Sequence, residues 1–397
     1  MWAGRRVVIG VSGGIACYKS CLLARRLTEA GAQVDVVLTQ GAAEFVRPLT
    51  FEALTGRPVL GSIWEPGGAL SHVRLGQGAD LVIVAPATAH LLARMAQGLA
   101  DDLLTTLLLA AIAPVLVAPA MNDEMFAHPQ TQANLDRLRA RGVAVVGPEV
   151  GALAEGPSER PGRMSEPETI LAHAARVLRG RGGLTGRRVV VTAGPTREPI
   201  DPVRVVTNRS SGKMGYRVAE VAWERGAEVL LIAGPVALAD PVGVRVRRVE
   251  TTRELEAAVR DELPDTDVLV MAAAPADFRP IEPSDSKRAR LEGAVAIPME
   301  PTDDILSGTR GVRKSGSVIV GFALETGDAL AKGRAKLERK DLDLIVVNDA
   351  AEPGAGFEVD TNRVALLGRD GGARILPLQS KRAVAEAILD AVERSLG

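Results

Sequence analysis

The sequence predicts an α/β protein with two doubly wound parallel sheets in tandem. Short apolar runs alternate with helical patterns along the chain, which is the order expected when each strand is followed by a helix that crosses back over the sheet. The second half repeats the order of the first: residues 29–34, Glu-Ala-Gly-Ala-Gln-Val, are echoed by residues 224–229, Glu-Arg-Gly-Ala-Glu-Val. The repeat is loose, so it indicates two related domains of the Rossmann or flavodoxin type rather than a solenoid.

The first half carries five candidate strands. Each is an apolar run that reaches glycine, proline or small polar residues, as is typical of a buried parallel strand and the turn after it. The strands are predicted at residues 7–10, 34–38, 79–84, 115–118 and 143–146, with helices at about 15–30, 91–99 and 103–111.

The second half begins with a strand, residues 189–191, that no helix follows directly. Pro195, Pro199 and Pro202 oppose a helix, so an irregular loop is expected up to a helix that starts at Met214. Further strands are predicted at residues 268–270, 318–321 and 344–347, then a hairpin strand at 364–367 and a last helix at 380–396.

An arginine- and glycine-rich segment separates the two halves. Residues 176–186 are almost devoid of apolar side chains after Leu178. We therefore predict domains at residues 1–178 and 187–397, joined by a linker at residues 179–186.

Composition limits the class of protein. The 397 residues are 46% hydrophobic and 24% charged, with a net charge of −1, as expected of globular domains with sizeable cores. This balance provides no field that would attract nucleic acid, and aromatic residues, at 3%, are too few for base-stacking platforms. With neither a membrane-spanning stretch nor a signal peptide in the sequence, a cytoplasmic protein is expected.

The turn Ser12-Gly13-Gly14 joins the first strand to its helix. It is either an ordinary tight turn or a phosphate cradle made of a hydroxyl and flexible backbone. It lacks the first glycine of the dinucleotide fingerprint, and no acidic residue ends the second strand, at Thr39-Gln40. These features favour a mononucleotide such as FMN over NAD.

Two residues near strand ends are candidates for chemistry in the first half. His72 precedes the third strand, beside the crevice where ligands collect in such sheets, although a lone histidine is more often structural. Asn122, in Pro119-Ala120-Met121-Asn122, follows the fourth strand and is either a turn residue or a donor to a carboxylate. Cys17 and Cys21, four residues apart in a helix, are predicted to be packing residues.

In the second half, Asn208, Ser210, Ser211, Gly212 and Lys213 gather at a predicted helix N-terminus, where anions bind well. The spacing is not that of a P-loop. Further along, Asp277 and Lys287 follow a strand, and Lys336 and Lys340 share a helical face. The second pair could equally be surface charge.

With these motifs assembled, the whole chain resembles the bifunctional coenzyme A biosynthesis family, phosphopantothenoylcysteine decarboxylase fused to phosphopantothenate–cysteine ligase. Several blocks in the right order carry the resemblance: Ser12-Gly13-Gly14-Ile15-Ala16, Ala85-Pro86-Ala87-Thr88, Ala100-Asp101-Asp102-Leu103-Leu104, Ala118-Pro119-Ala120-Met121-Asn122, Thr192-Ala193-Gly194-Pro195-Thr196-Arg197-Glu198, Asn208 to Gly215, Val320-Gly321-Phe322-Ala323 and Leu342 to Asp349.

For the first half, the resemblance implies an FMN-dependent decarboxylase. FMN oxidises the cysteinyl thiol of the substrate to a thioaldehyde, carbon dioxide leaves, and the hydride returns. His72 then manages a proton, and Asn122 holds the departing carboxylate. The flavin contacts implied are Ser12, Gly13, Gly14, Thr39, Pro86, Ala87, Thr88 and Met121.

One position departs from the family pattern. The family usually has Ala-Cys-Gly in a flap, whose cysteine serves the last proton and hydride step, whereas this chain has Ala154-Glu155-Gly156. Glu155 is either a replacement proton donor, with a raised pKa in a closed site, or an ordinary surface glutamate.

For the second half, the resemblance implies that CTP activates 4′-phosphopantothenate as an acyl-cytidylate, from which the amine of cysteine displaces CMP. Lysines and Mg²⁺, bound mainly through CTP, neutralise the triphosphate. Asn208 holds the acyl-cytidylate. The CTP or substrate contacts implied are Ser210, Ser211, Gly212, Lys213, Ala274, Asp277, Lys287, Asp303, Asp304, Ile305, Leu306, Phe322, Lys336 and Lys340. The family also implies a homo-oligomer with trimeric decarboxylase and dimeric ligase contacts.

Two other functions remain open on the sequence alone. The glycine-bearing turns are compatible with a nicotinamide-dependent oxidoreductase. The missing flap cysteine is compatible with a flavin- and nucleotide-binding protein whose decarboxylase half is inactive.

Overall fold

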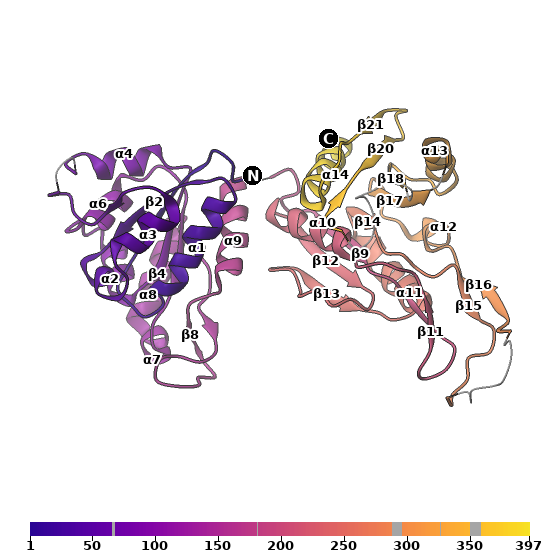
Figure 1. The fold of residues 1–397 in the computed structure, drawn as a ribbon, viewed down its shortest axis with the longest axis horizontal. Helices are drawn as coiled ribbons and strands as arrows, with labels where there is room; N and C mark the ends of the chain where they lie inside the picture. Colours follow the sequence, from indigo (N-terminus) through magenta and orange to yellow (C-terminus); the bar gives the residue numbers. More distant parts are fainter. Residues whose placement is uncertain (66–67, 181, 288–295, 326, 350–358) are drawn as a thin grey trace. The chain divides into compact units, whose positions relative to one another are not determined.

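The computed structural model describes the fold of all residues except 66–67, 181, 288–295, 326 and 350–358 (Figure 1). The chain divides into two compact units, Met1–Gly180 and Arg181–Gly397. The division falls inside the segment predicted as a linker, but Leu184 in that segment is fully buried. Gly182 lies against Arg225 of the second unit, so this unit already includes residues before its first strand.

The first unit is built on a six-stranded parallel sheet with the strand order β3-β2-β1-β4-β5-β6. The chain proceeds outward from β1 in one direction and then outward from β4 in the other. The loops after β1 and β4 therefore diverge, which leaves a crevice at the carboxyl ends of these strands. The strands are β1 (Arg6–Val11), β2 (Gln33–Leu38), β3 (Val59–Leu60), β4 (Leu81–Ala87), β5 (Val115–Pro119) and β6 (Ala144–Val145), and a separate antiparallel pair is formed by β7 (Glu149–Val150) and β8 (Pro161–Arg163).

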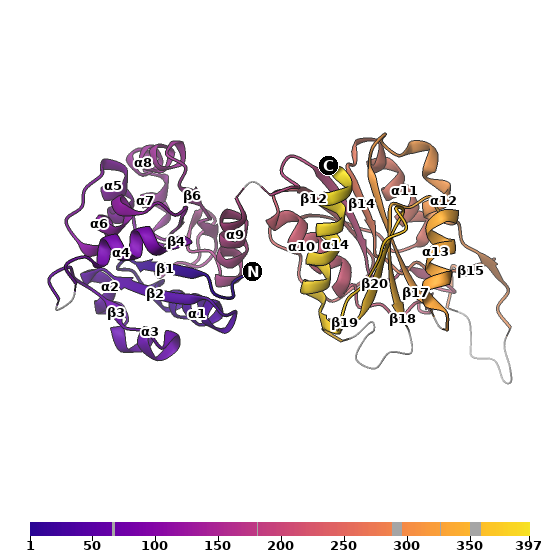
Figure 2. The same cartoon turned by 90° about the horizontal axis from the view of Figure 1, so that it is seen from above.

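Helices cover both faces of this sheet (Figure 2). Alternate residues of β1 point to opposite faces: Val7 and Ile9 pack with α1, α3 and α9, whereas Val8 packs with α4, α5, α6 and α8. The strands are apolar on both sides because both faces are buried. The helices are α1 (Cys17–Glu29), α2 (Gln40–Phe45), α3 (Pro48–Thr55), α4 (Ser71–Gly78), α5 (Ala89–Gln97), α6 (Leu103–Ala110), α7 (Asp123–Ala127), α8 (Pro129–Ala140) and α9 (Pro167–Arg179).

The second unit repeats this plan in an eight-stranded sheet with the order β13-β12-β9-β14-β17-β18-β20-β21. The first six strands are parallel, and the last two extend the sheet as antiparallel strands. The strands of this sheet are β9 (Arg188–Ala193), β12 (Glu228–Ala233), β13 (Arg245–Arg248), β14 (Val268–Met271), β17 (Val318–Glu325), β18 (Leu344–Asp349), β20 (Val364–Gly368) and β21 (Ala373–Ile375).

Helices α11, α12 and α13 pack on one face of the second sheet, and α10 and α14 lie side by side on the other (Figure 2). These helices are α10 (Lys213–Glu224), α11 (Thr252–Glu262), α12 (Ile305–Gly308), α13 (Ala329–Arg339) and α14 (Lys381–Leu396), with short 3₁₀ turns η1 (Leu263–Asp265) and η2 (Arg310–Val312).

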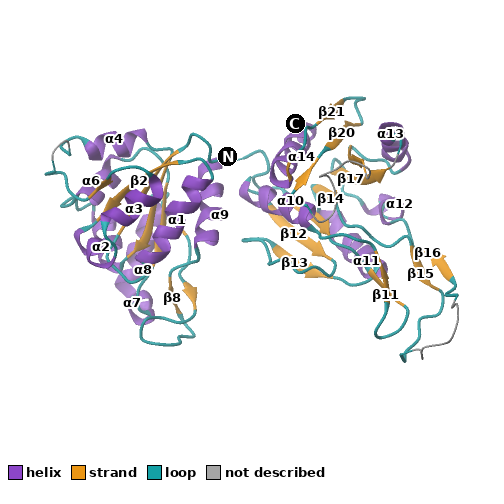
Figure 3. Cartoon of the chain, in the orientation of Figure 1, coloured by secondary structure: helices purple, strands orange, loops and turns teal. Residues whose placement is uncertain are grey.

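The architecture confirms the predicted tandem of doubly wound sheets, with one local correction. The segment after β9, predicted as an irregular loop, contains the antiparallel hairpin of β10 (Arg197–Pro199) and β11 (Val205–Thr207). Figure 3 shows this hairpin and a second one, β15 (Phe278–Pro280) with β16 (Met299–Pro301), as short strands. A further short pair joins β19 (Thr361–Asn362) to β22 (Gln379–Ser380).

Among the helices of the described residues, none is long and apolar enough to cross a membrane.

Candidate active sites

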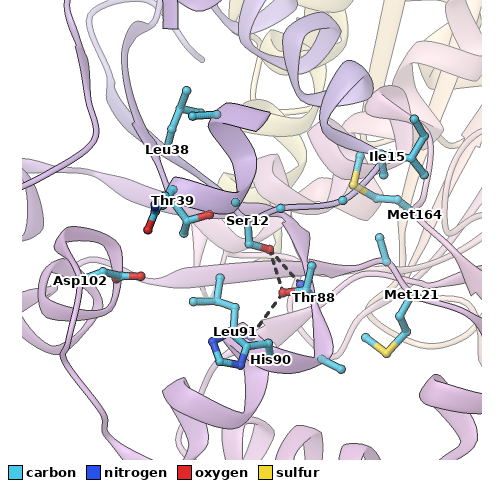
Figure 4. A pocket seen from close by; sticks show the side chains of 18 of the residues that line it. Ser12, Ile15, Leu38, Thr39, Thr88, His90, Leu91, Asp102, Met121 and Met164 are labelled. Atoms are coloured by element: carbon cyan, nitrogen blue, oxygen red, sulfur yellow. Dashed lines mark hydrogen bonds between the residues drawn. The ribbon is translucent and has the colours of Figure 1, made fainter. Parts of the chain in front are cut away.

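The crevice of the first sheet opens into a cavity of about 1300 Å³ (Figure 4). Its walls come from the ends of β1, β2, β4 and β5 and from the loop between β7 and β8. The residues predicted for the flavin and the substrate that line this cavity are Ser12, Gly13, Gly14, Thr39, Thr88, Met121, Asn122 and Glu155.

Ser12 ties the turn after β1 to the turn after β4. Its Oγ donates to the carbonyl oxygen of Pro86 at 2.7 Å. The same Oγ accepts from the backbone N–H of Thr88 at 3.0 Å (Figure 4). Thr88 in turn caps α5, because its Oγ1 accepts from the N–H of Leu91 at 3.3 Å. Pro86 and Ala87, predicted as flavin contacts, are buried beneath this turn, so their side chains are not among those that line the cavity.

Gly13 is required by close backbone packing. A Cβ at this position would lie 2.6 Å from the carbonyl carbon of Gly41, in the first turn of α2. At Gly14 the nearest atom to an added Cβ would be Thr88 Cγ2 at 3.8 Å, so its backbone borders open space. The backbone between β1 and α1 therefore forms a narrow cradle, with the N-terminus of α5 beside it, where a phosphate group fits well.

Charged residues that the sequence reasoning did not assign also line the cavity. Arg94 Nη1 donates to Asp102 Oδ2 at 2.8 Å, and Asp102 caps α6 through a reciprocal pair of bonds with Thr105. Burial alone would raise the pKa of Asp102, but hydrogen bonds from Thr105 and Arg94 outweigh it and hold that pKa below its ordinary value. His90 also lines the cavity and is exposed. Only the family block around Asp101 and Asp102 gave any sequence signal for this group.

Asn122 lies at the junction of β5 and α7, with its side chain held in one orientation. Its Oδ1 accepts from the backbone N–H groups of Glu124 at 2.9 Å and Met125 at 3.4 Å, which caps α7. Its Nδ2 donates to Oε1 of Glu155, from the loop between β7 and β8. The structure thus brings together Asn122, expected to hold a carboxylate, and Glu155, expected to be either a proton donor or an ordinary surface glutamate.

His72 is not among the residues that line this cavity. It lies in α4, half-buried, and its Nδ1 is buried without a hydrogen-bond partner among the described residues. His72 lies at the start of α4, the helix that returns the chain to the amino end of β4. The catalytic role expected for His72 stays a prediction.

In the second unit, the turn after β9 forms the centre of the predicted nucleotide site. Pro195 pairs with Ala274, and the Nδ2 of Asn208 donates to the carbonyl oxygens of Pro275 at 2.9 Å and Ala274 at 3.5 Å. Gly234 closes this turn from β12, and a Cβ there would lie 1.8 Å from the carbonyl oxygen of Pro195. Asn208 and Ala274, predicted from widely separated motifs, are thus in direct contact.

The predicted anion loop ends at the start of α10. Gly212 is the N-cap residue with a φ of 73°, a conformation that favours glycine, and its N–H donates to Ser210 Oγ at 3.4 Å. Ser211 is half-buried beside it, and Lys213 makes an ion pair with Asp360 at 2.7 Å. The loop therefore presents backbone and hydroxyl groups at a helix N-terminus, as predicted.

A chain of contacts extends from Asp277 toward the lysines of α13. The carbonyl oxygen of Asp277 accepts from the N–H of Thr302, next to Asp303. Asp304 caps α12 and pairs with Lys340 at 3.1 Å. Burial alone would raise the pKa of Asp304, but the nearby charge of Lys340 holds that pKa below its ordinary value.

The remaining predicted contacts differ in exposure. Phe322 is half-buried in β17, and Lys336 pairs with Glu325 at the end of that strand. Ile305 and Leu306, expected as CTP or substrate contacts, have side chains that are buried in the core. Lys287 is exposed between β15 and β16, beside the undescribed residues 288–295.

Among the residues that the structure describes, no three His, Cys, Asp or Glu side chains are grouped so that they could hold a metal ion. At the second site, the carboxylate of Asp304 is instead paired with the ammonium group of Lys340.

Comparison with known proteins covers both units. A family model described as flavoprotein matches residues 1–179, and one described as DNA/pantothenate metabolism flavoprotein C-terminal domain matches residues 184–396. The chain is 50% identical to the coenzyme A biosynthesis bifunctional protein CoaBC of Mycobacterium bovis, over 98% of this chain and 96% of that protein. It is 42% identical to the protein of the same name from Escherichia coli K12, over 98% of this chain and 97% of that protein.

One solved structure, the C-terminal domain of a CoaBC protein, is 39% identical and covers 54% of this chain and 98% of its own, with a TM-score of 0.46. The full-length matches confirm the resemblance that the motif blocks suggested. The chain belongs to the CoaBC family of bifunctional coenzyme A biosynthesis proteins, and it is a bifunctional enzyme.

Proposed function

We propose that the chain catalyses two consecutive reactions of coenzyme A biosynthesis. The second unit joins cysteine to 4′-phosphopantothenate at the expense of CTP. The first unit then decarboxylates the product, phosphopantothenoylcysteine, to 4′-phosphopantetheine. The observation that carries the proposal is the cavity at the crevice of the first sheet, because it combines a phosphate cradle with an amide donor fixed toward its interior.

The first cavity fits FMN. The backbone of Gly13 and Gly14 and the hydroxyl of Thr88 would hold the phosphate, while Ser12 would tie the two turns together through Pro86 and Thr88. Thr39 and Met121 would border the rest of the cofactor. FMN bound there would supply the two-electron oxidation of the substrate thiol that makes loss of carbon dioxide easy.

The protein's own groups would then orient the substrate and move protons. Asn122 would bind the substrate carboxylate through Nδ2, because its Oδ1 is already engaged by the N-terminus of α7. Glu155, close to that amide, would deliver a proton to the decarboxylated product.

We assign the role of His72 to a second copy of the chain, because His72 is not among the residues that line the cavity of its own unit. We place it in the cavity of a neighbouring copy within a trimer of decarboxylase units. In that arrangement each site takes His72 from one chain and Asn122 from another.

This arrangement predicts complementation between two inactive variants. His72→Asn and Asn122→Asp should each lack decarboxylase activity when expressed alone. Mixed oligomers from equal co-expression should recover about a quarter of the wild-type rate, because about a quarter of the sites then receive both native residues. Carbon dioxide release from purified mixed oligomers is the measurement, and a mixture as inactive as either variant alone would refute the shared site.

The second unit would bind CTP at the turns after β9 and β14. Asn208 would hold the acyl-cytidylate, and Lys287, Lys336 and Lys340 would offset the charge of the triphosphate, together with Mg²⁺ that arrives with the nucleotide. The amine of cysteine would displace CMP from the activated carboxyl carbon. We also propose that two ligase units from different copies of the chain contact each other as a dimer.

The cofactor assignment is tested by the visible spectrum of the purified protein. We expect a yellow protein whose denaturation releases FMN, identified by its mass. A colourless protein that ignores added FMN but binds a nicotinamide dinucleotide would overturn the assignment in favour of the alternative oxidoreductase.

A further inference from the structure

The orientation of the Asn122 amide limits what this residue can recognise. Two backbone N–H groups of α7 occupy its Oδ1, so only the Nδ2 donor remains for a partner in the cavity. A donor without a neighbouring acceptor favours a carboxylate over a neutral amide or a hydroxyl that must also donate. In the structure that carboxylate belongs to Glu155.

Glu155 is presented to Asn122 by a tight turn. Reciprocal backbone bonds join Leu153 and Gly156, at 2.8 and 3.1 Å, and leave Ala154 and Glu155 at the tip. Leu153, Ala154 and Glu155 all line the cavity.

The loop that carries this turn is docked on the segment that follows β5. Ser158 Oγ donates to Asp123 Oδ2 at 2.5 Å, Arg160 pairs with Glu124, and the N–H of Met121 donates to the carbonyl oxygen of Gly162 at 3.0 Å. These bonds hold the base of the loop, so the Glu155 side chain can leave Asn122 while the loop stays attached.

We propose that Glu155 is a built-in competitor for the substrate carboxylate. It occupies the Asn122 donor until a ligand carboxylate displaces it, and it returns when that carboxylate is lost as carbon dioxide. The inference rests on the proposed function, because it assigns the substrate carboxylate to Asn122. It makes Glu155 a specificity residue that weakens binding of every carboxylate ligand and leaves carboxylate-free ligands unaffected.

The expected size follows from the competition. If Glu155 occupies the donor most of the time, the apparent affinity for a carboxylate ligand falls by the fraction of protein in which the donor is free. Removing the Glu155 carboxylate should therefore tighten such a ligand by about three- to tenfold.

Two inert probes separate carboxylate recognition from everything else. N-(4′-phosphopantothenoyl)alanine keeps the carboxylate of the substrate but lacks its sulfur, so it is not oxidised. N-(4′-phosphopantothenoyl)ethylamine lacks the carboxylate as well. Binding of both is measured by titration calorimetry on the full-length, FMN-loaded protein.

The variants are Glu155→Ala and, as a matched control, Glu159→Ala. Glu159 is an exposed glutamate of the same loop that is not among the cavity-lining residues, so its removal reports the effect of charge alone. The double variant Glu155→Ala with Asn122→Ala tests whether the effect passes through the amide.

Glu155→Ala should bind the alanine probe about three- to tenfold more tightly and the ethylamine probe as before, and the gain should vanish without Asn122. Three outcomes would overturn this inference and leave the proposed function standing. They are equal changes for both probes, an equally large gain in Glu159→Ala, and weaker binding of the alanine probe by Glu155→Ala. If neither probe binds the wild-type protein, the proposed function fails and the inference with it.

Discussion

Asn122→Asp should lower kcat/KM for decarboxylation by about 100-fold or more, because a single lost donor at a reacting group already costs this much. The aspartate keeps an oxygen where Oδ1 caps α7, and asparagine and aspartate are about equally good caps. It replaces the Nδ2 donor with a second anionic oxygen, which repels the substrate carboxylate. The variant therefore separates recognition from structural support. The measurement is carbon dioxide release from phosphopantothenoylcysteine.

The second unit provides the internal control for this variant. Pyrophosphate release by the ligase reaction and the thermal unfolding midpoint should both match the wild type, since the cap of α7 is preserved. Decarboxylation at the wild-type rate by Asn122→Asp would contradict the role of the amide.

Lys287→Gln should reduce formation of the acyl-cytidylate by about 100-fold or more, because it removes a positive charge that the proposed function directs at the triphosphate. The segment before Lys287 is fixed to the loop that leads to Asn208, since the N–H of Ser284 donates to the carbonyl oxygen of Ile200 at 3.0 Å. Lys287 itself is exposed and supports no core packing, so the fold should not change. The measurement is pyrophosphate release with CTP and 4′-phosphopantothenate, before cysteine is added.

Lys314→Gln is the matched control. Lys314 is also partly exposed, but it pairs with Asp267 at 2.7 Å at the amino ends of β14 and β17, away from the turns that follow these strands. It should retain the wild-type rate. Equal losses in both lysine variants, or none in Lys287→Gln, would argue against a specific role for Lys287.

The central strands of both sheets could be predicted because burial on two faces makes them continuous apolar runs. The edge strands could not. Val59–Leu60 is too short to form a pattern, and Arg245–Arg248 is mostly charged because one side of an edge strand meets solvent. The hairpin of β10 and β11 contains prolines, which hid it from a reading based on apolar alternation.

The candidate sites could be predicted where they depend on strand order. Parallel strands end at one edge, and Ser12 and Thr88, which the resemblance implied as flavin contacts, do meet there. Contacts made by loops depend on loop conformation, which no periodicity encodes. The bond between Asn122 and Glu155 is of this kind, and so is the position of His72 outside the cavity of its own chain.

One assay tests the central claim most directly. The FMN-loaded protein is supplied with CTP, Mg²⁺, cysteine and 4′-phosphopantothenate, and pyrophosphate and carbon dioxide are followed together. The account predicts CTP-dependent release of pyrophosphate, followed by carbon dioxide in equal amount. Pyrophosphate without carbon dioxide would contradict an active decarboxylase, and the absence of both products would contradict the bifunctional enzyme.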